Sequence, residues 1–164
     1  MVRSLRIVVT CFCFAVSVMA CSATGKIDCE GSFKYNPDAF SPEEQSWIQE
    51  SSDRWNAWVG YRVTSVQPGH SDYCAIDVGK TSRDSAIGQT SEYRGNINII
   101  VDEDDLRSEK ILDRSHFESV VMHEMGHAIG YGHIKTGAAL MAPFGAPDFT
   151  DLDHKACINL GMCR

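Results

Sequence analysis

The sequence feature that most constrains the fold is the run His-Glu-Met-Gly-His-Ala-Ile-Gly-Tyr-Gly-His at residues 123–133. A helix brings residues four positions apart onto one face, so His123 and His127 can face the same point from successive turns. Glu124 then lies about 100° around the helix axis from His123. Gly130 can end the helix in a left-handed conformation, after which the chain can turn back and bring His133 to the other two histidines.

Such an arrangement is typical of a hydrolytic zinc site. Imidazole nitrogens are common zinc ligands, and three of them leave a fourth tetrahedral position for water. Glu124 would lie beside that position, where a carboxylate can take a proton from the water. We therefore predict one catalytic Zn²⁺ bound by His123, His127 and His133, with Glu124 as the catalytic base. An amphipathic helix with exposed histidines is the simpler alternative, but it does not require the glycine and third histidine at this spacing.

Residues 1–20 have the pattern of a secretory signal peptide, because Arg3 and Arg6 precede an apolar run that is too short to span a bilayer. The segment Val18-Met19-Ala20-Cys21 resembles a bacterial lipobox, in which the cysteine is lipidated and becomes the mature N-terminus. Ordinary cleavage after Ala20 or after Ala23 is the alternative. We expect export across the inner membrane, followed by lipid anchoring at the cell envelope through Cys21 or by release as an extracellular protein.

The number of cysteines fits an oxidising compartment. Two of the seven cysteines lie in the signal, and lipidation of Cys21 leaves an even set that suits two disulfides, namely Cys29, Cys74, Cys157 and Cys163. Four cysteines allow three pairings, of which we favour Cys29 with Cys74 and Cys157 with Cys163. Cleavage after Ala23 would leave the same four, whereas cleavage after Ala20 would leave one odd thiol.

The charge and length of the mature chain limit its partners and domain count. Without residues 1–20 the chain has 13 basic and 22 acidic residues, a formal net charge of −9, which argues against nucleic acid as a partner. Residues 21–30 are small and polar and form a tether, and residues 31–164 suffice for one domain. We expect a monomer that acts on a protein or peptide substrate and contacts a membrane only through its N-terminal lipid.

Hydrophobic periodicity in residues 31–164 predicts an α+β domain with a small twisted mixed sheet. A helix should run from the capping box Ser41-Pro42-Glu43-Glu44 to Gly60, and the metal-binding helix should begin at a second box, Ser115-His116-Phe117-Glu118. A C-terminal helix should begin at Thr150 and end near Gly161. The expected strands are at residues 33–35, 61–66, 74–78, 86–90 and 96–101.

These features resemble the metzincin zinc proteases, whose motif H-E-x-x-H-x-x-G-x-x-H is followed by a Met-turn. Met141 resembles the Met of that turn, since it follows His133 by eight residues and is flanked much as in the matrixin (matrix metalloprotease-like) branch. Residues 33–58 and 99–105 also resemble matrixins. The resemblance implies a minimal bacterial-type metzincin catalytic domain, a zinc endopeptidase that cleaves peptide bonds with metal-activated water and Glu124 as general base, with Met141 in a hydrophobic floor beneath the imidazoles.

Several positions depart from the matrixin pattern. Ile134 stands where matrixins place Ser or Thr. Gln89 and Ile100 stand near the positions that hold a second, structural zinc in animal matrixins, so we predict that this second zinc is absent. Asp102-Glu103-Asp104-Asp105 resembles the matrixin calcium-binding run. We favour a solvated acidic turn over bound Ca²⁺, because the rest of an oxygen-rich loop is not recognisable.

The resemblance also suggests how a substrate would bind. An extended peptide would pair with an edge strand near residues 86–90, and a pocket bounded by Val120 and residues 143–145 would select a side chain. Two alternatives remain at this stage. One is a catalytically idle surface module that keeps zinc for stability, and the other is a zinc hydrolase that acts on cell-wall peptides.

Overall fold

The computed structural model describes residues 29, 31–72, 74–81, 87–93, 96–108, 113–135, 138–143 and 145–163. The predicted signal peptide, Cys21 and all of the predicted tether except Cys29 lie outside these residues. In chain order the elements are β1 (Ser32–Tyr35), α1 (Pro42–Val59), β2 (Ser65–Pro68), β3 (Ala75–Gly79), β4 (Gly88–Tyr93), β5 (Asn96–Asp102), α2 (Glu103–Arg107), α3 (Arg114–Ala128) and α4 (Asp151–Asn159).

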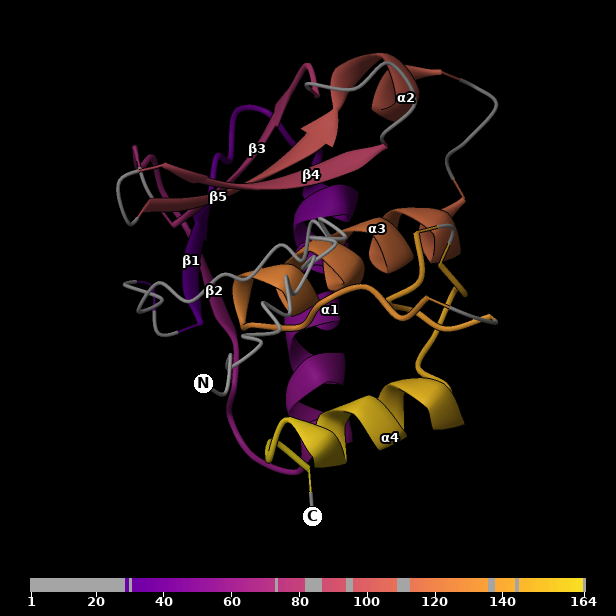
Figure 1. Ribbon diagram of the computed structural model, residues 1–164. Coiled ribbons are helices and arrows are strands. Elements are labelled where there is room, and N and C mark those ends of the chain that lie inside the picture. The colour runs from indigo at the N-terminus through magenta and orange to yellow at the C-terminus, as the bar shows by residue number, and fades with distance from the viewer. Residues whose placement is uncertain are drawn as a thin grey trace, which may run out of the picture.

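The strands form one mixed sheet in the order β2-β1-β3-β5-β4. Neighbouring strands are parallel except β4, which pairs antiparallel with β5 at one edge. Helices α1 and α3 pack against each other and against the sheet, and α4 lies on the far side of α3 from the sheet (Figure 1). The expected α+β architecture is therefore confirmed, and the short helix α2 is an addition to it.

Helix α1 has the ends that the sequence predicts. The Ser41 hydroxyl accepts a hydrogen bond from the Glu44 amide at 3.3 Å, and the Ser41 amide donates to the Glu44 carboxylate at 2.6 Å. Gly60 ends the helix with a φ of 87°. Within the helix, the fully buried Trp55 donates its indole N–H to the Met122 carbonyl at 2.8 Å. This bond ties α1 to the middle of α3 within the hydrophobic core.

The predicted strand at residues 61–66 is wrong in its position, because β2 spans Ser65–Pro68. The Asn56 side chain accepts hydrogen bonds from the Val63 and Thr64 amides at 2.7 and 2.9 Å, and it donates to the Thr64 carbonyl at 3.0 Å. These backbone groups therefore bond to α1 and are not free to pair with β1. The strand can end in proline because it lies at a sheet edge, where a missing amide proton costs little.

The remaining predicted strands are close to those observed. Strand β4 runs to Tyr93, three residues beyond the predicted end at Thr90, and the ends of β3 and β5 differ from the prediction by one residue at most. Both favoured disulfides are present, Cys29–Cys74 and Cys157–Cys163, with Cα atoms 5.5 and 5.1 Å apart. Among the described helices, none combines the length and apolar character that crossing a membrane requires.

Gly31 and Gly60 both have left-handed backbones, but only Gly31 lies in close contact with another segment, the one before β2. Substituting both residues therefore separates the cost of that contact from the cost of the left-handed backbone. Gly31 and Gly60 have φ angles of 73° and 87°. A Cβ at Gly31 would overlap the Val63 carbonyl oxygen, whereas a Cβ at Gly60 would meet nothing within 4 Å. We expect Gly60→Ala to lower the free energy of unfolding by about 1–2 kcal/mol, the cost of a left-handed backbone, and Gly31→Ala to lower it by at least twice as much. Urea unfolding measures both losses, and equal losses would contradict the predicted clash.

Candidate metal centre

Helix α3 begins two residues earlier than predicted, with Asp113 as its N-cap. The Asp113 carboxylate accepts a hydrogen bond from the His116 amide at 2.9 Å. The predicted capping box at Ser115 is wrong because Glu118 has other partners: its carboxylate bonds to Arg54 at 2.7 Å and to Arg114 at 2.6 Å. Aspartate caps a helix as well as serine does. The N-cap residue that marks the start of α3 could therefore have been recognised in the sequence as Asp113.

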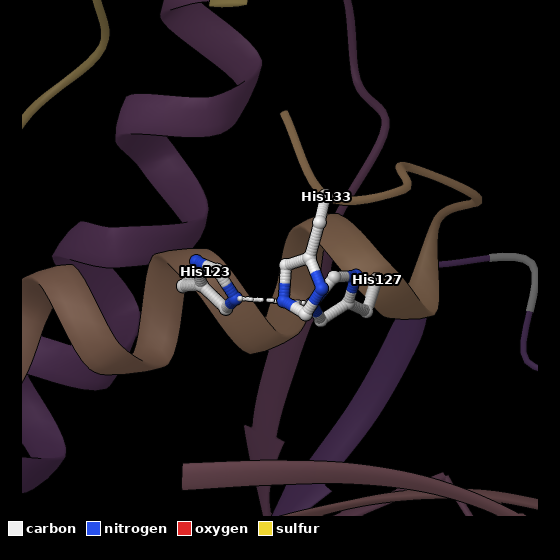
Figure 2. Close-up of side chains that lie close together, drawn as sticks. All are labelled: His123, His127 and His133. Carbon is white, nitrogen blue, oxygen red and sulfur yellow. Dashed lines mark hydrogen bonds between the residues drawn. The ribbon is translucent and has the colours of Figure 1, made fainter. Parts of the chain in front are cut away.

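The end of α3 brings the three predicted histidines together. Gly130 has a φ of 102°, and the Tyr131 amide donates to the Gly126 carbonyl at 2.8 Å, which turns the chain back over the helix. Figure 2 shows two imidazoles from α3 and the third from the returning segment, with their nitrogens directed at one another. The distances between Nε2 atoms are 3.0 Å for His123–His127, 3.1 Å for His127–His133 and 3.2 Å for His123–His133.

The hydrogen bonds made by Nδ1 of His123 and His127 show whether the Nε2 atoms of these rings could bind a metal. His123 Nδ1 lies 2.7 Å from the Leu140 carbonyl oxygen, and His127 Nδ1 lies 2.8 Å from the Tyr131 carbonyl oxygen. A carbonyl only accepts, so each Nδ1 carries the proton and each neutral ring presents an Nε2 lone pair. Burial lowers the pKa of both His123 and His127, which favours the neutral rings.

Lone pairs that face one another are stable only with a cation between them. Tetrahedral zinc, with Zn–N distances of about 2.0–2.1 Å, would place ligand nitrogens about 3.3–3.4 Å apart, close to the observed 3.0–3.2 Å. Among the described residues, no other group of three His, Cys, Asp or Glu brings ligand atoms into such a cluster. His123, His127 and His133 therefore fit a zinc ion.

Glu124 lies beside the histidine cluster in a buried position. The residue is only 6% exposed, and its Oε2 accepts a hydrogen bond from the Thr90 hydroxyl at 2.7 Å. Burial raises the pKa of Glu124, and the bond from Thr90 opposes that rise. The carboxylate is therefore held in place by a residue of β4, a contact that no spacing in the sequence indicates.

Strand β4 passes unusually close to α3 at Gly88. A Cβ at this position would lie 2.7 Å from Val120 Cγ1 and 3.0 Å from Glu124 Cγ. Glycine therefore allows the edge strand to lie directly against the helix turn that carries Glu124. A glycine within a strand often marks such a close approach, so Gly88 was a usable signal in the sequence.

Met141 lies beneath the histidine-bearing part of α3. Its side chain is fully buried, and a Cβ at Gly126 would overlap its sulfur atom. Gly126 lies between His123 and His127 in the helix, so Met141 packs against the backbone that carries both rings. This contact explains why a residue without a side chain stands at position 126, while the role of Met141 as a floor beneath the imidazoles stays a prediction.

Asp153 holds the loop that contains Met141. Its carboxylate is fully buried and accepts hydrogen bonds from the Leu140 and Met141 amides, each at 3.0 Å, and from the Thr150 amide at 2.8 Å. Asp153 belongs to the first turn of α4. Because the Leu140 carbonyl accepts from His123, Asp153 fixes the orientation of a metal ligand from a distant helix.

Two further regions correspond to metal sites of matrixins: Gln89 with Ile100, near the second zinc site, and the acidic run at residues 102–105, near the calcium site. Gln89 and Ile100 lie opposite each other on β4 and β5, and the absence of a second zinc stays a prediction. Asp102, in the acidic run, caps α2 by accepting from the Asp104 and Asp105 amides. The Thr81 amide also bonds to the Asp102 carboxylate, at 3.2 Å, and this bond lowers the pKa of Asp102.

The chain is similar to known proteins in its sequence and in its fold. The family model described as Matrixin matches residues 30–155. Archaemetzincin from Methanopyrus kandleri has a similar structure, with a TM-score of 0.51 and 15% identity over 79% of this chain and 94% of that chain. The GM1-bound form of the ECX AB5 holotoxin has a TM-score of 0.43 and 14% identity over 81% of this chain and 72% of that chain, which is too low to establish a common fold. No curated protein matches this sequence significantly. The likeness to archaemetzincin shows a metzincin fold.

Substitution of Asp153 tests the link between α4 and the metal site. In Asp153→Asn, the amide NH₂ must face a backbone N–H donor, so at least one buried hydrogen bond is lost. We expect the free energy of unfolding to fall by about 1–3 kcal/mol, and zinc affinity to fall as the Leu140 carbonyl moves. Urea unfolding and competition with a zinc chelator measure the two effects. Asp151→Asn, at an exposed position of the same helix turn, is the control; equal zinc affinity in the two variants would contradict the link.

Proposed function

The chain belongs to the matrixin family of zinc metallopeptidases, and on this premise we propose that it is an endopeptidase that cleaves protein or peptide substrates internally. The observation that carries the proposal is the buried Glu124 carboxylate beside three imidazoles whose Nε2 atoms converge within 3.2 Å. Zn²⁺ bound by His123, His127 and His133 would supply Lewis acidity, which lowers the pKa of water and polarises a carbonyl.

Glu124 would act as the proton carrier. Its carboxylate would take a proton from the attacking water and deliver it to the amine that leaves when the peptide bond breaks. The raised pKa of Glu124, caused mainly by burial, suits a group that must hold this proton between the two transfers. The hydrogen bonds of His123 and His127 to backbone carbonyls would keep both rings in the ligating tautomer throughout.

The position of β4 supports cleavage within a chain. Strand β4 is an edge strand that pairs with β5 among the described strands, and it lies directly against α3 near Glu124. An extended peptide can add to such an edge through backbone hydrogen bonds. This recognition requires no free terminus, which favours an endopeptidase.

The pocket that we propose for a substrate side chain is bounded by Val120 and residues 143–145, and Gly145 in it cannot easily be replaced by a larger residue. Val120 is partly buried beside β4, and Phe144 lies outside the described residues. A Cβ at Gly145 would lie 2.5 Å from the Leu140 carbonyl oxygen, the acceptor of the His123 hydrogen bond. A side chain at Gly145 would therefore disturb the carbonyl that orients His123. Because position 145 has to be glycine, only backbone atoms would line this end of the proposed pocket.

Substitution of Glu124 tests the proposed function. Glu124→Gln keeps the shape of the side chain but removes its ability to carry the proton, so we expect kcat/KM on a casein or gelatin panel to fall about 10²–10⁴-fold. Zinc content, measured by metal analysis, should stay at one ion per chain. Glu103→Gln, at an exposed position of α2, is the control and should keep full activity.

The outcomes separate the three candidate functions. Full activity of zinc-loaded Glu124→Gln would refute the role of Glu124. A zinc-loaded wild-type protein that cleaves no substrate would favour the idle binding module. Cleavage of cell-wall peptides without cleavage of the protein panel would favour the cell-wall hydrolase.

We further propose that the protein is exported and anchored through a lipid on Cys21. The two disulfides support an oxidising compartment. Mass spectrometry of the mature protein should find a lipid-modified Cys21 at the N-terminus, and Cys21→Ser should move the protein out of the membrane fraction. An unmodified mature N-terminus, at residue 21 or at residue 24, would contradict the anchor.

A further inference from the structure

One hydroxyl group of the edge strand contacts Glu124 at two points. Thr90 Oγ1 lies 2.7 Å from Glu124 Oε2 and 2.8 Å from the Glu124 backbone oxygen. Thr90 and Gly88 are two residues apart in β4, so both face α3. The two residues thus lie beside the same side chain, although that side chain belongs to a helix far along the sequence.

The hydroxyl has a single proton to donate. A backbone carbonyl and an ionised carboxylate both accept, so the two contacts compete for that proton, and the charged acceptor forms the stronger bond. Thr90 therefore donates to Oε2 when Glu124 is ionised. A terminal carboxylate torsion is otherwise broad, and this bond fixes the orientation of the whole group.

The second carboxylate oxygen faces Gly88. A Cβ at Gly88 would lie 3.1 Å from Glu124 Oε1, so the glycine leaves the space beside this oxygen open. With Oε2 engaged by Thr90, Oε1 is the oxygen with more room to receive a proton. The two β4 residues thus give the two oxygens of one carboxylate different surroundings.

We propose that Thr90 is a positioning residue that fixes Glu124 through Oε2, so that Oε1 carries the proton during peptide hydrolysis. In the first step an O–H bond of the attacking water breaks and an Oε1–H bond forms, while the water oxygen bonds to the carbonyl carbon and the C=O π pair moves to the carbonyl oxygen. In the second step the Oε1–H bond breaks and its proton passes to the nitrogen, as the C–N bond breaks and the C=O double bond forms again. The inference rests on the proposed role of Glu124 as the general base.

The arrangement also connects substrate binding with the proton carrier. Strand β4 is the edge on which we propose that the substrate lies, and the same strand holds Glu124 through Thr90. The position of the bound peptide backbone and the orientation of the carboxylate are therefore set by one element. A displaced carboxylate should slow the reaction more than it weakens substrate binding, because small errors of position between reacting groups can cost about 100-fold in rate.

Three variants of the zinc-loaded protein test this inference. Thr90→Val replaces the hydroxyl with a methyl group of similar size, and we expect kcat to fall about 10- to 100-fold while KM stays within about twofold, since binding is not disturbed. Thr90→Ser keeps the hydroxyl and should restore kcat to near the wild-type value. Ser46→Ala removes an exposed hydroxyl of α1 that also donates to a carboxylate, that of Glu50, and should have no effect. If Thr90→Val does not fold, Thr90→Ala replaces it in the same comparison.

Measurements besides activity separate positioning from general stability. Zinc content should be the same in all variants. In a double-mutant cycle, adding Thr90→Val to Glu124→Gln should not lower the residual kcat further, and the urea midpoints of the four proteins should show coupling between the two residues. Wild-type kcat in zinc-loaded Thr90→Val, or a low kcat in Thr90→Ser, would overturn the inference. If Glu124→Gln is inactive while Thr90→Val is fully active, the inference alone fails; if Glu124→Gln is fully active, the proposed function fails with it.

Discussion

The metal centre depends on two hydrogen bonds from imidazole Nδ1–H groups to backbone carbonyls. His123 donates to the Leu140 carbonyl and His127 donates to the Tyr131 carbonyl, at 2.7 and 2.8 Å. These bonds fix which nitrogen of each ring carries the proton, and they direct the Nε2 lone pairs at a common point. Both acceptors lie in the chain that returns over α3 after Gly130. The ligand geometry is therefore set by the path of the backbone and not by the spacing of the histidines alone.

Residues from three other elements hold either this returning segment or helix α3 itself. Asp153 of α4 binds the amides of the Met141 loop, and Met141 packs against Gly126 of α3. Trp55 of α1 bonds to a carbonyl of α3, and Thr90 of β4 bonds to Glu124 from the sheet side. A buried carboxylate that accepts several backbone amides is a strong and directional anchor. Helix α4 thus supports the site through hydrogen bonds to the loop, although it supplies none of the three histidines.

The sequence could predict the parts of this structure that depend on local spacing. The histidine cluster, the capping of α1 at Ser41 and the turn at Gly130 each follow from residues within one or two helix turns. The start of α3 was misplaced because Glu118, which completes a local capping pattern, bonds instead to Arg54 on another helix. The contact of Thr90 with helix α3 was missed for the same physical reason, because it joins elements that are distant in the chain. Local residue spacing does not predict which strand lies against which turn of a helix.

Three imidazoles, two of them held neutral and oriented by backbone carbonyls, should bind one zinc ion and leave a position open for water. X-ray absorption spectroscopy at the zinc edge tests it most directly on the purified zinc-loaded protein. We expect four-coordinate zinc with three imidazole nitrogens and one further oxygen or nitrogen ligand at about 2.0–2.1 Å. A sulfur ligand at about 2.3 Å, or a coordination shell with fewer than three imidazoles, would contradict it.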